Sequence, residues 1–237
     1  MTHLQRAFVV LSLGLVAGLP HTASAQISLG ADIVSRYIWR GTDFGESASI
    51  QPTLAYGSGN LEIGTWASYS ISFDGARANE HDLYLTYTIP VGESGSLDLG
   101  ITDYYFPAPR SAKLFNFDGD GGGAHLLELV AGFTGKDSFP ISVYAAYMAH
   151  NDPDGSLYIE SNYPASVGDV DVGLTLALVR GKSALYGVDG SSIVSMGLSA
   201  SKDLSITEQF SLPLSVAWIV NPTAERSFLV FGISLAP

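Results

Sequence analysis

The sequence predicts an all-β fold, a transmembrane antiparallel up-and-down β-barrel of about 12 strands that follows a cleaved signal peptide. Three observations predict it: apolar and polar residues alternate along most of the chain, shorter and longer connections alternate, and the apolar content is high without a run long enough for a membrane helix. Of the 237 residues, 46% are hydrophobic and 14% are charged, which excludes a disordered chain. The absence of cysteine excludes disulfides, cysteine-bound zinc and cysteine nucleophiles.

Residues 1–25 are typical of a secretory signal peptide. An apolar run from Phe8 to Leu19 follows Arg6, and Ala23 and Ala25 form an Ala-x-Ala cleavage site. The run is too short to span a bilayer, which takes roughly 20 residues. We therefore expect export, cleavage before Gln26 and a single barrel domain over residues 26–237.

The charge balance excludes one class of partner. The chain has 11 Lys and Arg against 23 Asp and Glu, a formal net charge of -12. Nucleic-acid binding needs clustered cations that neutralise phosphates, and the sequence has no such cluster. We therefore expect no nucleic-acid partner.

Alternation with period two organises residues 26–237. In a strand, successive side chains point to opposite faces, so this pattern predicts one apolar and one polar face. We count twelve such runs, over residues 27–40, 48–56, 61–71, 80–89, 96–106, 124–133, 141–150, 156–163, 169–180, 191–200, 209–219 and 227–235.

The connections favour a membrane barrel over a soluble sandwich, in which alternation is also found. Loops of one set, at 41–47, 72–79, 107–123, 151–155, 181–190 and 220–226, are longer on average than turns of the other, at 57–60, 90–95, 134–140, 164–168 and 201–208. Phe210 and Trp218 lie on one apolar face, roughly 20 Å apart along the membrane normal, which approaches the apolar band of about 25 Å. Other aromatics of apolar-face parity lie near strand ends and are expected at the membrane interfaces: Tyr37, Trp39, Tyr56, Tyr69, Tyr87, Tyr105, Phe133 and Tyr163.

Charged residues fall on the face opposite the apolar one. A slip of one residue would turn them toward lipid, where Arg near the midplane costs about 2–4 kcal/mol, so they fix the register. The predicted pore-lining residues are Asp32, Arg36, Arg40, Glu62, Asp82, Asp98, Glu128, Glu160 and Asp171. Two hypotheses remain for Arg36 and Arg40: a charged constriction that selects solutes, or an interior salt-bridge network that rigidifies the barrel.

Three stretches of the first half resemble a known family. They are SRYIWRGTDFGESASIQPTLAYGSGNLEIGTWASYS from Ser35, DLYLTYT from Asp82 and DLGITDYYFP from Asp98. They resemble the TorF family of proteobacterial porins, and the resemblance extends loosely over residues 26–237. It implies an outer-membrane β-barrel, assigned as a channel mainly by architecture, and implies no catalytic residue. The residues that match its most recognisable motif are Ser35, Arg36, Tyr37, Trp39, Arg40 and Gly41.

The expected function is that of a porin in the Gram-negative outer membrane, which passes small hydrophilic solutes by passive diffusion. Outer-membrane lipids are the expected partner, because an apolar belt must be covered, while association into homo-oligomers stays open. We expect no cofactor, no metal and no enzymatic activity. The alternatives are a non-conducting structural or adhesive barrel and, third, a lipid-modifying enzyme, for which no GxSxG elbow or ordered Ser, His and acid cluster is present.

Two acidic loops suggest a further hypothesis. NFDGDGGG and HNDPDG carry the carboxylates Asp118, Asp120, Asp152 and Asp154 beside histidines His81, His125 and His150. Calcium takes several oxygen ligands from flexible loops, but the spacing is not that of an EF-hand. Solvated loops are the simpler interpretation, and His81 and His125 share the parity of apolar residues, which predicts that they point outward.

Overall fold

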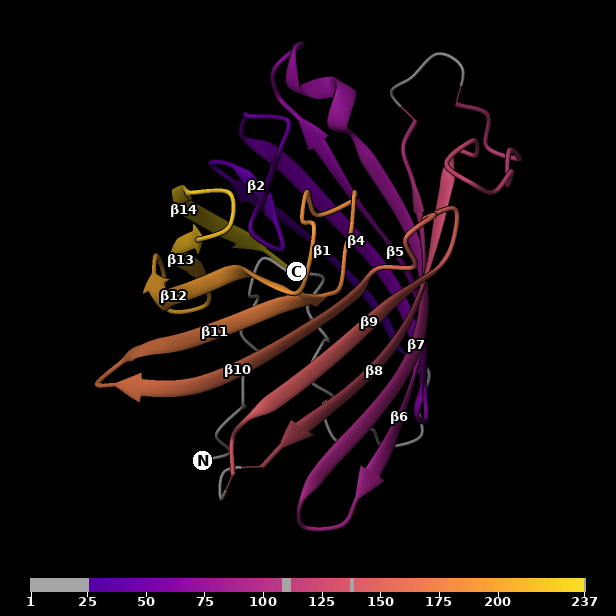
Figure 1. The fold of residues 1–237 in the computed structure, drawn as a ribbon. Helices are drawn as coiled ribbons and strands as arrows, with labels where there is room; N and C mark the ends of the chain where they lie inside the picture. Colours follow the sequence, from indigo (N-terminus) through magenta and orange to yellow (C-terminus); the bar gives the residue numbers. More distant parts are fainter. Residues whose placement is uncertain (1–25, 108–111, 137–138, 237) are drawn as a thin grey trace.

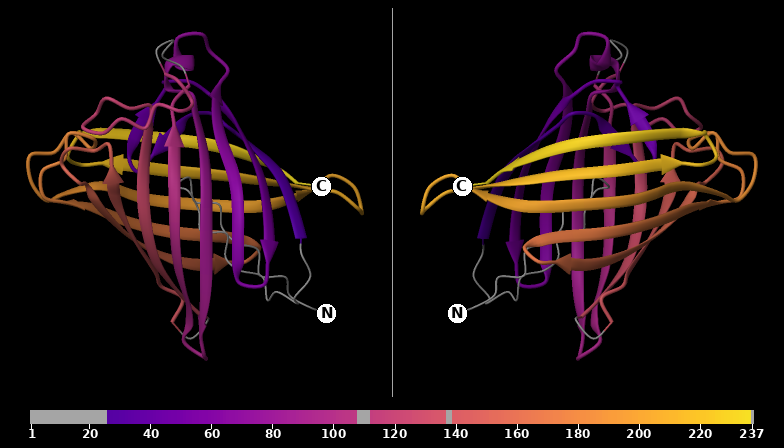
Figure 2. Two further views of the ribbon diagram at one scale, coloured as in Figure 1. Left: turned by 90° about the vertical axis from the view of Figure 1, so that its right-hand side faces the viewer. Right: turned by 90° about the vertical axis from the view of Figure 1, so that its left-hand side faces the viewer.

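The computed structural model describes residues 26–107, 112–136 and 139–236, so the expected signal peptide, residues 1–25, lies outside the described residues. Twelve antiparallel strands form a closed barrel, which confirms the predicted fold class. Figures 1 and 2 show the curved wall from indigo β1 round to yellow β14. The barrel strands are β1 (Gln26–Val34), β4 (Ser49–Ser58), β5 (Leu61–Ser70), β6 (Glu80–Val91), β7 (Gly95–Tyr105), β8 (His125–Gly135), β9 (Ser142–His150), β10 (Leu157–Val167), β11 (Val170–Arg180), β12 (Ser192–Ser205), β13 (Ser211–Asn221) and β14 (Arg226–Leu235).

Each strand pairs with its neighbours along the chain, and the pairing of β1 with β14 closes the wall. Closure leaves no open sheet edge, which is the condition for a sheet in lipid. The connections at one end, here called the loop end, are 35–48, 71–79, 106–124, 151–156, 181–191 and 222–225. Those at the other end, the turn end, are 59–60, 92–94, 136–141, 168–169 and 206–210.

The predicted alternation is present in the wall. On β7, Leu97, Leu99 and Ile101 are exposed, whereas Asp98 and Thr102, at positions of the opposite parity, are buried. In a closed barrel the buried set must face the lumen, so the exposed set forms the outer surface. Several predicted interface aromatics do lie exposed on that surface: Tyr56, Tyr69, Tyr87, Tyr163, Phe210 and Trp218.

Helices contribute little to the fold. A short 3-10 helix, η1 (Gly75–Ala78), lies in the 71–79 loop. Within the part of the chain that the structure describes, no helix is long and apolar enough to cross a membrane.

The first predicted strand, 27–40, is wrong in its second half. The strand β1 ends at Val34, and the chain then forms a separate hairpin of β2 (Tyr37–Trp39) and β3 (Thr42–Phe44) before it joins β4. Val34 is paired with Ser49, so the wall is complete without residues 35–48, which we call the plug hairpin. Figure 1 shows it, in indigo, inside the curve of the wall.

The plug hairpin turns sharply because of two residues. Arg40 and Gly41 have φ values of 49° and 81°, the combination that a two-residue type I′ turn requires. Tyr37 and Trp39, on the hairpin, are buried inside the barrel at 4% and 5% exposure. The prediction that they lie at the membrane interfaces is therefore wrong. The alternation of residues 35–40 is real, but it belongs to a strand of the hairpin.

Candidate functional site

The tip of the plug hairpin carries a guanidinium into the lumen, where it meets a carboxylate from the wall. Arg40 is 3% exposed and Glu128, on β8, is fully buried. Arg40 Nη1 lies 2.7 Å from Glu128 Oε2, and Nη2 lies 2.8 Å from Oε1. Parallel double hydrogen bonds of this kind are the strongest form of ion pair between side chains. The pair links the hairpin to the far wall.

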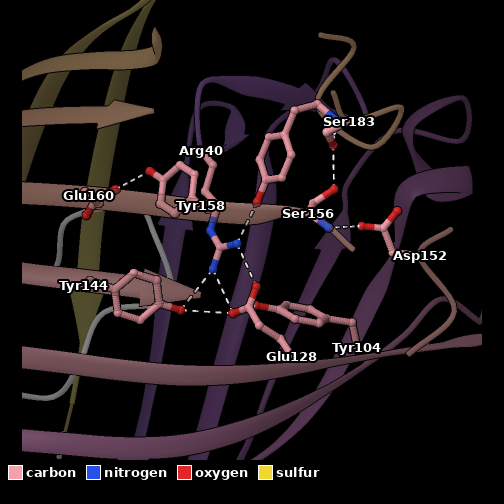
Figure 3. A network of polar contacts seen from close by, with 10 residues as sticks. Arg40, Tyr104, Glu128, Tyr144, Asp152, Ser156, Tyr158, Glu160 and Ser183 are labelled. Atoms are coloured by element: carbon pink, nitrogen blue, oxygen red, sulfur yellow. Dashed lines mark hydrogen bonds and ion pairs between the residues drawn. The ribbon is translucent and has the colours of Figure 1, made fainter. Parts of the chain in front are cut away.

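Three tyrosines hydrogen-bond to this ion pair, as Figure 3 shows in part. Arg40 donates to the hydroxyls of Tyr186, from the 181–191 loop, at 2.7 Å and of Tyr144, on β9, at 2.9 Å. The hydroxyls of Tyr144 and of Tyr104, on β7, both donate to Glu128 Oε1 at 3.0 Å. Buried charges are tolerated only when they are paired and hydrogen-bonded, and this arrangement meets both conditions.

Aromatic rings enclose the guanidinium. Its Cζ lies 4.4 Å from the ring centroid of Tyr158, on β10, and 4.6 Å from that of Trp39. Such contacts are stabilising, and more so when water is excluded. Trp39 also stacks on Tyr186, with centroids 5.4 Å apart. Among the described residues, Arg40 Nε and Trp39 Nε1 are buried without a hydrogen-bond partner.

The electrostatics keep the guanidinium charged. Burial alone would lower the pKa of Arg40, but the charge of Glu128 and the surrounding tyrosines raise it well above its usual value. Burial raises the pKa of Tyr186 to about 12, against the opposing effect of Arg40. The guanidinium therefore stays positive and Tyr186 stays neutral over the physiological pH range.

A second contact holds the base of the plug hairpin. The hydroxyl of Tyr37 donates to Glu80 Oε2, on β6, at 3.0 Å, and its ring lies 5.5 Å from that of Trp66, on β5. Asp82, two residues along the same face of β6, is fully buried. The hairpin is thus attached to the wall at its base as well as at its tip.

The structure places the predicted pore-lining residues in three settings. Arg40 and Glu128 come together in the ion pair, whereas Arg36 is half-exposed and bonds Asp43 of its own hairpin at 2.7 Å. The two arginines therefore do not form a joint constriction, and the arrangement at Arg40 is that of an interior ion-pair network. The others lie on the inner wall, buried or half-buried: Asp32, Glu62, Asp82, Asp98, Glu160 and Asp171.

A family model described as a bacterial protein of unknown function (Gcw_chp) matches residues 16–227. The chain belongs to this family. Among curated proteins, none matches it.

Several residues of the site in this Gcw_chp protein were missed by sequence reasoning. Tyr104, Tyr144 and Tyr158 had a usable signal, because each lies at an inward-facing position of its strand. Tyr186 had none, since it lies in a loop whose path only the folded chain defines.

In the acidic loops of the Gcw_chp protein, Asp152 and Asp154 bind backbone groups. The carboxylate of Asp152 accepts the backbone N–H groups of Asp154 and Ser156, and that of Asp154 accepts the backbone N–H of Ala184. Within residues 26–107, 112–136 and 139–236, no group of three or more potential metal ligands is found. These carboxylates organise loop backbone.

The histidines do not pair with serine. His81 bonds the hydroxyl of Thr65, His125 bonds Asp103 and the carbonyl of Leu114, and His150 bonds the carbonyl of Phe117. Ser156 instead shares a hydrogen bond of 2.6 Å with Ser183, seen in Figure 3. In the described part of the chain, these hydrogen bonds join each histidine to a group other than a serine hydroxyl.

Proposed function

We propose that the protein is an outer-membrane porin, as its resemblance to the TorF family implies, and that its plug hairpin restricts the passage of solutes at the loop end. The observation that carries the proposal is the buried Arg40–Glu128 ion pair, which joins the tip of the hairpin to the far wall across the lumen. Side chains fill the interior of an eight-stranded barrel, whereas barrels of 16 to 18 strands enclose a water channel. The interior of a twelve-stranded barrel is intermediate in width. An inserted hairpin therefore decides whether solutes pass.

Two features of the structure support this proposal. The outer wall is apolar, as in a membrane barrel, whereas the inner wall carries acidic and other polar side chains beside a buried cluster of aromatic and apolar ones at the hairpin. Beside the plug hairpin, a cavity of about 40 Å³ remains against β11, β12 and β13. A buried water needs about 10–15 Å³ by the same measure, so this space holds a few waters and no larger solute.

Replacing the plug hairpin tests the proposal directly. Since Val34 pairs with Ser49, residues 36–47 can be exchanged for Asn-Gly, the preferred two-residue turn, with Ser35 and Ala48 continuing the strands. We expect this turn variant to raise single-channel conductance in planar lipid bilayers several-fold over the unaltered protein. The physical reason is that the wall stays closed while the hairpin that obstructs the lumen is removed.

Folding of the turn variant is checked by its β-sheet circular dichroism in detergent. If the variant folds and its conductance equals that of the unaltered protein, the proposal is wrong. A second candidate function, a non-conducting structural barrel, is favoured by the dense bonding around Arg40. That candidate predicts no conductance from the unaltered protein and, if the lumen is blocked elsewhere too, none from the turn variant.

A substitution on the outer wall tests the membrane location. Leu129 lies mid-strand on β8 and is 49% exposed on the outer surface. We expect Leu129→Arg to lower the free energy of unfolding in lipid vesicles by about 2–4 kcal/mol, because the charge would lie in hydrocarbon. Urea titration followed by tryptophan fluorescence measures this loss.

Ala224→Arg, at an exposed position of the 222–225 loop, is the matched control and should change the stability by about 0–1 kcal/mol. Equal effects of the two substitutions would contradict a lipid-facing Leu129.

A further inference from the structure

The inner wall of the barrel carries many carboxyl groups. Eight acidic side chains occupy inward-facing positions of seven strands, and all are buried or half-buried. They are Asp32, Glu62, Glu80, Asp82, Asp98, Glu128, Glu160 and Asp171. The ionisable groups at these inward-facing positions are therefore all acidic.

Neutral groups satisfy several of these acids. Asp98 accepts a hydrogen bond of 2.5 Å from the hydroxyl of Thr88, and Asp171 accepts one of 3.0 Å from Ser166. Glu62 is hydrogen-bonded by the hydroxyl of Tyr84. A hydroxyl donor holds a carboxylate in place without cancelling its charge.

The basic side chains of the described residues either form ion pairs or lie at exposed positions outside the lumen. Both hairpin arginines have their own acids, since Arg40 pairs with Glu128 and Arg36 with Asp43. Lys202, of outward parity on β12, pairs with Asp169 at 2.6 Å. The other Lys and Arg of the described residues are exposed at strand ends or in connections: Arg77, Lys113, Lys136, Arg180, Lys182 and Arg226.

The charges of the wall therefore set a preference among solutes. We infer that the lumen takes up and passes small cations, inorganic or organic, and repels anions. Acidic residues around a pore select cations, and low-dielectric walls concentrate the field of fixed charges in the space they enclose. This inference rests on the proposed porin function and names its solute class. It also differs from the hypothesis of an arginine constriction, because each arginine is paired with an acid.

Reversal potentials of the turn variant test the inference, because that variant gives a measurable current. With KCl at different concentrations on the two sides of a planar bilayer, we expect K⁺ to be several-fold more permeant than Cl⁻. The preference should weaken as KCl rises toward 1 M, where the screening length falls to about 3 Å.

Substitutions that replace wall carboxylates by neutral amides identify the source of the preference. Glu62→Gln, Asp98→Asn and Asp171→Asn, combined in the turn variant, keep an oxygen acceptor for each hydroxyl donor and remove three wall charges. We expect the K⁺ preference to fall toward equal permeability. Asp98→Asn alone should give a smaller loss in the same direction, and it serves if the triple variant does not fold.

The matched control removes three exposed charges outside the lumen, by Glu93→Gln, Glu208→Gln and Glu225→Gln, and should leave the preference unchanged. A conducting turn variant with equal permeabilities, or with a Cl⁻ preference, would overturn the cation inference and leave the porin function standing. A folded turn variant without conductance would contradict both the cation inference and the porin function. An equal loss of selectivity in the control set would assign the preference to surface charge and refute a role for the wall.

Discussion

Arg40→Ala is expected to lower the free energy of unfolding by about 3–5 kcal/mol, because it leaves the carboxylate of Glu128 buried without its cation. Glu128 is fully buried, and only the hydroxyls of Tyr104 and Tyr144 would still donate to it. The loss is measured by urea unfolding of the protein in detergent or lipid vesicles. Single-channel conductance should rise as well, since the tip of the plug hairpin loses its link to β8.

The double variant Arg40→Met with Glu128→Met separates the ion pair from simple loss of packing. Removal of both partners of a buried ion pair is often nearly neutral, whereas removal of one is costly. We therefore expect the double variant to be more stable than either Arg40→Met or Glu128→Met alone. If the stability lost in the double variant equals the sum of the losses in the two single variants, the two side chains do not depend on each other. The ion pair is then not the contact that holds the hairpin.

Gly41→Ala is expected to dislodge the plug hairpin and to raise conductance several-fold while the barrel stays folded. A Cβ at position 41 would overlap the carbonyl oxygen of Val194, a backbone atom of β12 that cannot move without breaking the wall. The positive φ of 81° adds to this cost, because left-handed backbone costs a residue with a side chain roughly 1–2 kcal/mol. Planar-bilayer recordings measure the conductance, and circular dichroism verifies the barrel.

Gly59→Ala separates the overlap from the backbone conformation. Gly59, in the turn between β4 and β5, also has a positive φ, of 61°, but a Cβ there would meet nothing within 4 Å. We expect this control to lose a little stability and to leave conductance unchanged. A similar conductance for the two alanine variants would show that close contact with β12 does not seat the hairpin.

The wall of the barrel was predictable because its signal is local. On β7, the sequence from Leu97 to Ile101 places apolar side chains at every second position, and a closed sheet in lipid has only one way to orient them. The same reasoning placed Asp98 and Glu128 inside, where they are found. Strand ends differ from the expected ones by a few residues, since alternation continues weakly into connections.

The plug hairpin was not predictable from the same signal. Tyr37 and Trp39 have the alternation of a lipid-facing strand, and a buried hairpin in the lumen gives an identical pattern. The residue pair Arg40-Gly41 was the one local indication of a turn, through the glycine. A short apolar alternation does not distinguish hydrocarbon from a packed interior.

The sequence by itself determined the membrane-type wall: twelve strands, the side of each that faces outward and the acidic character of the inner face. Only the tertiary structure decided that residues 35–48 enter the lumen and that Arg40 meets Glu128 there, 88 residues further along the chain. The physical reason is the separation along the chain of the residues that carry each signal. Alternation is a property of neighbouring residues, whereas closure of the lumen depends on side chains that become neighbours only when the barrel closes.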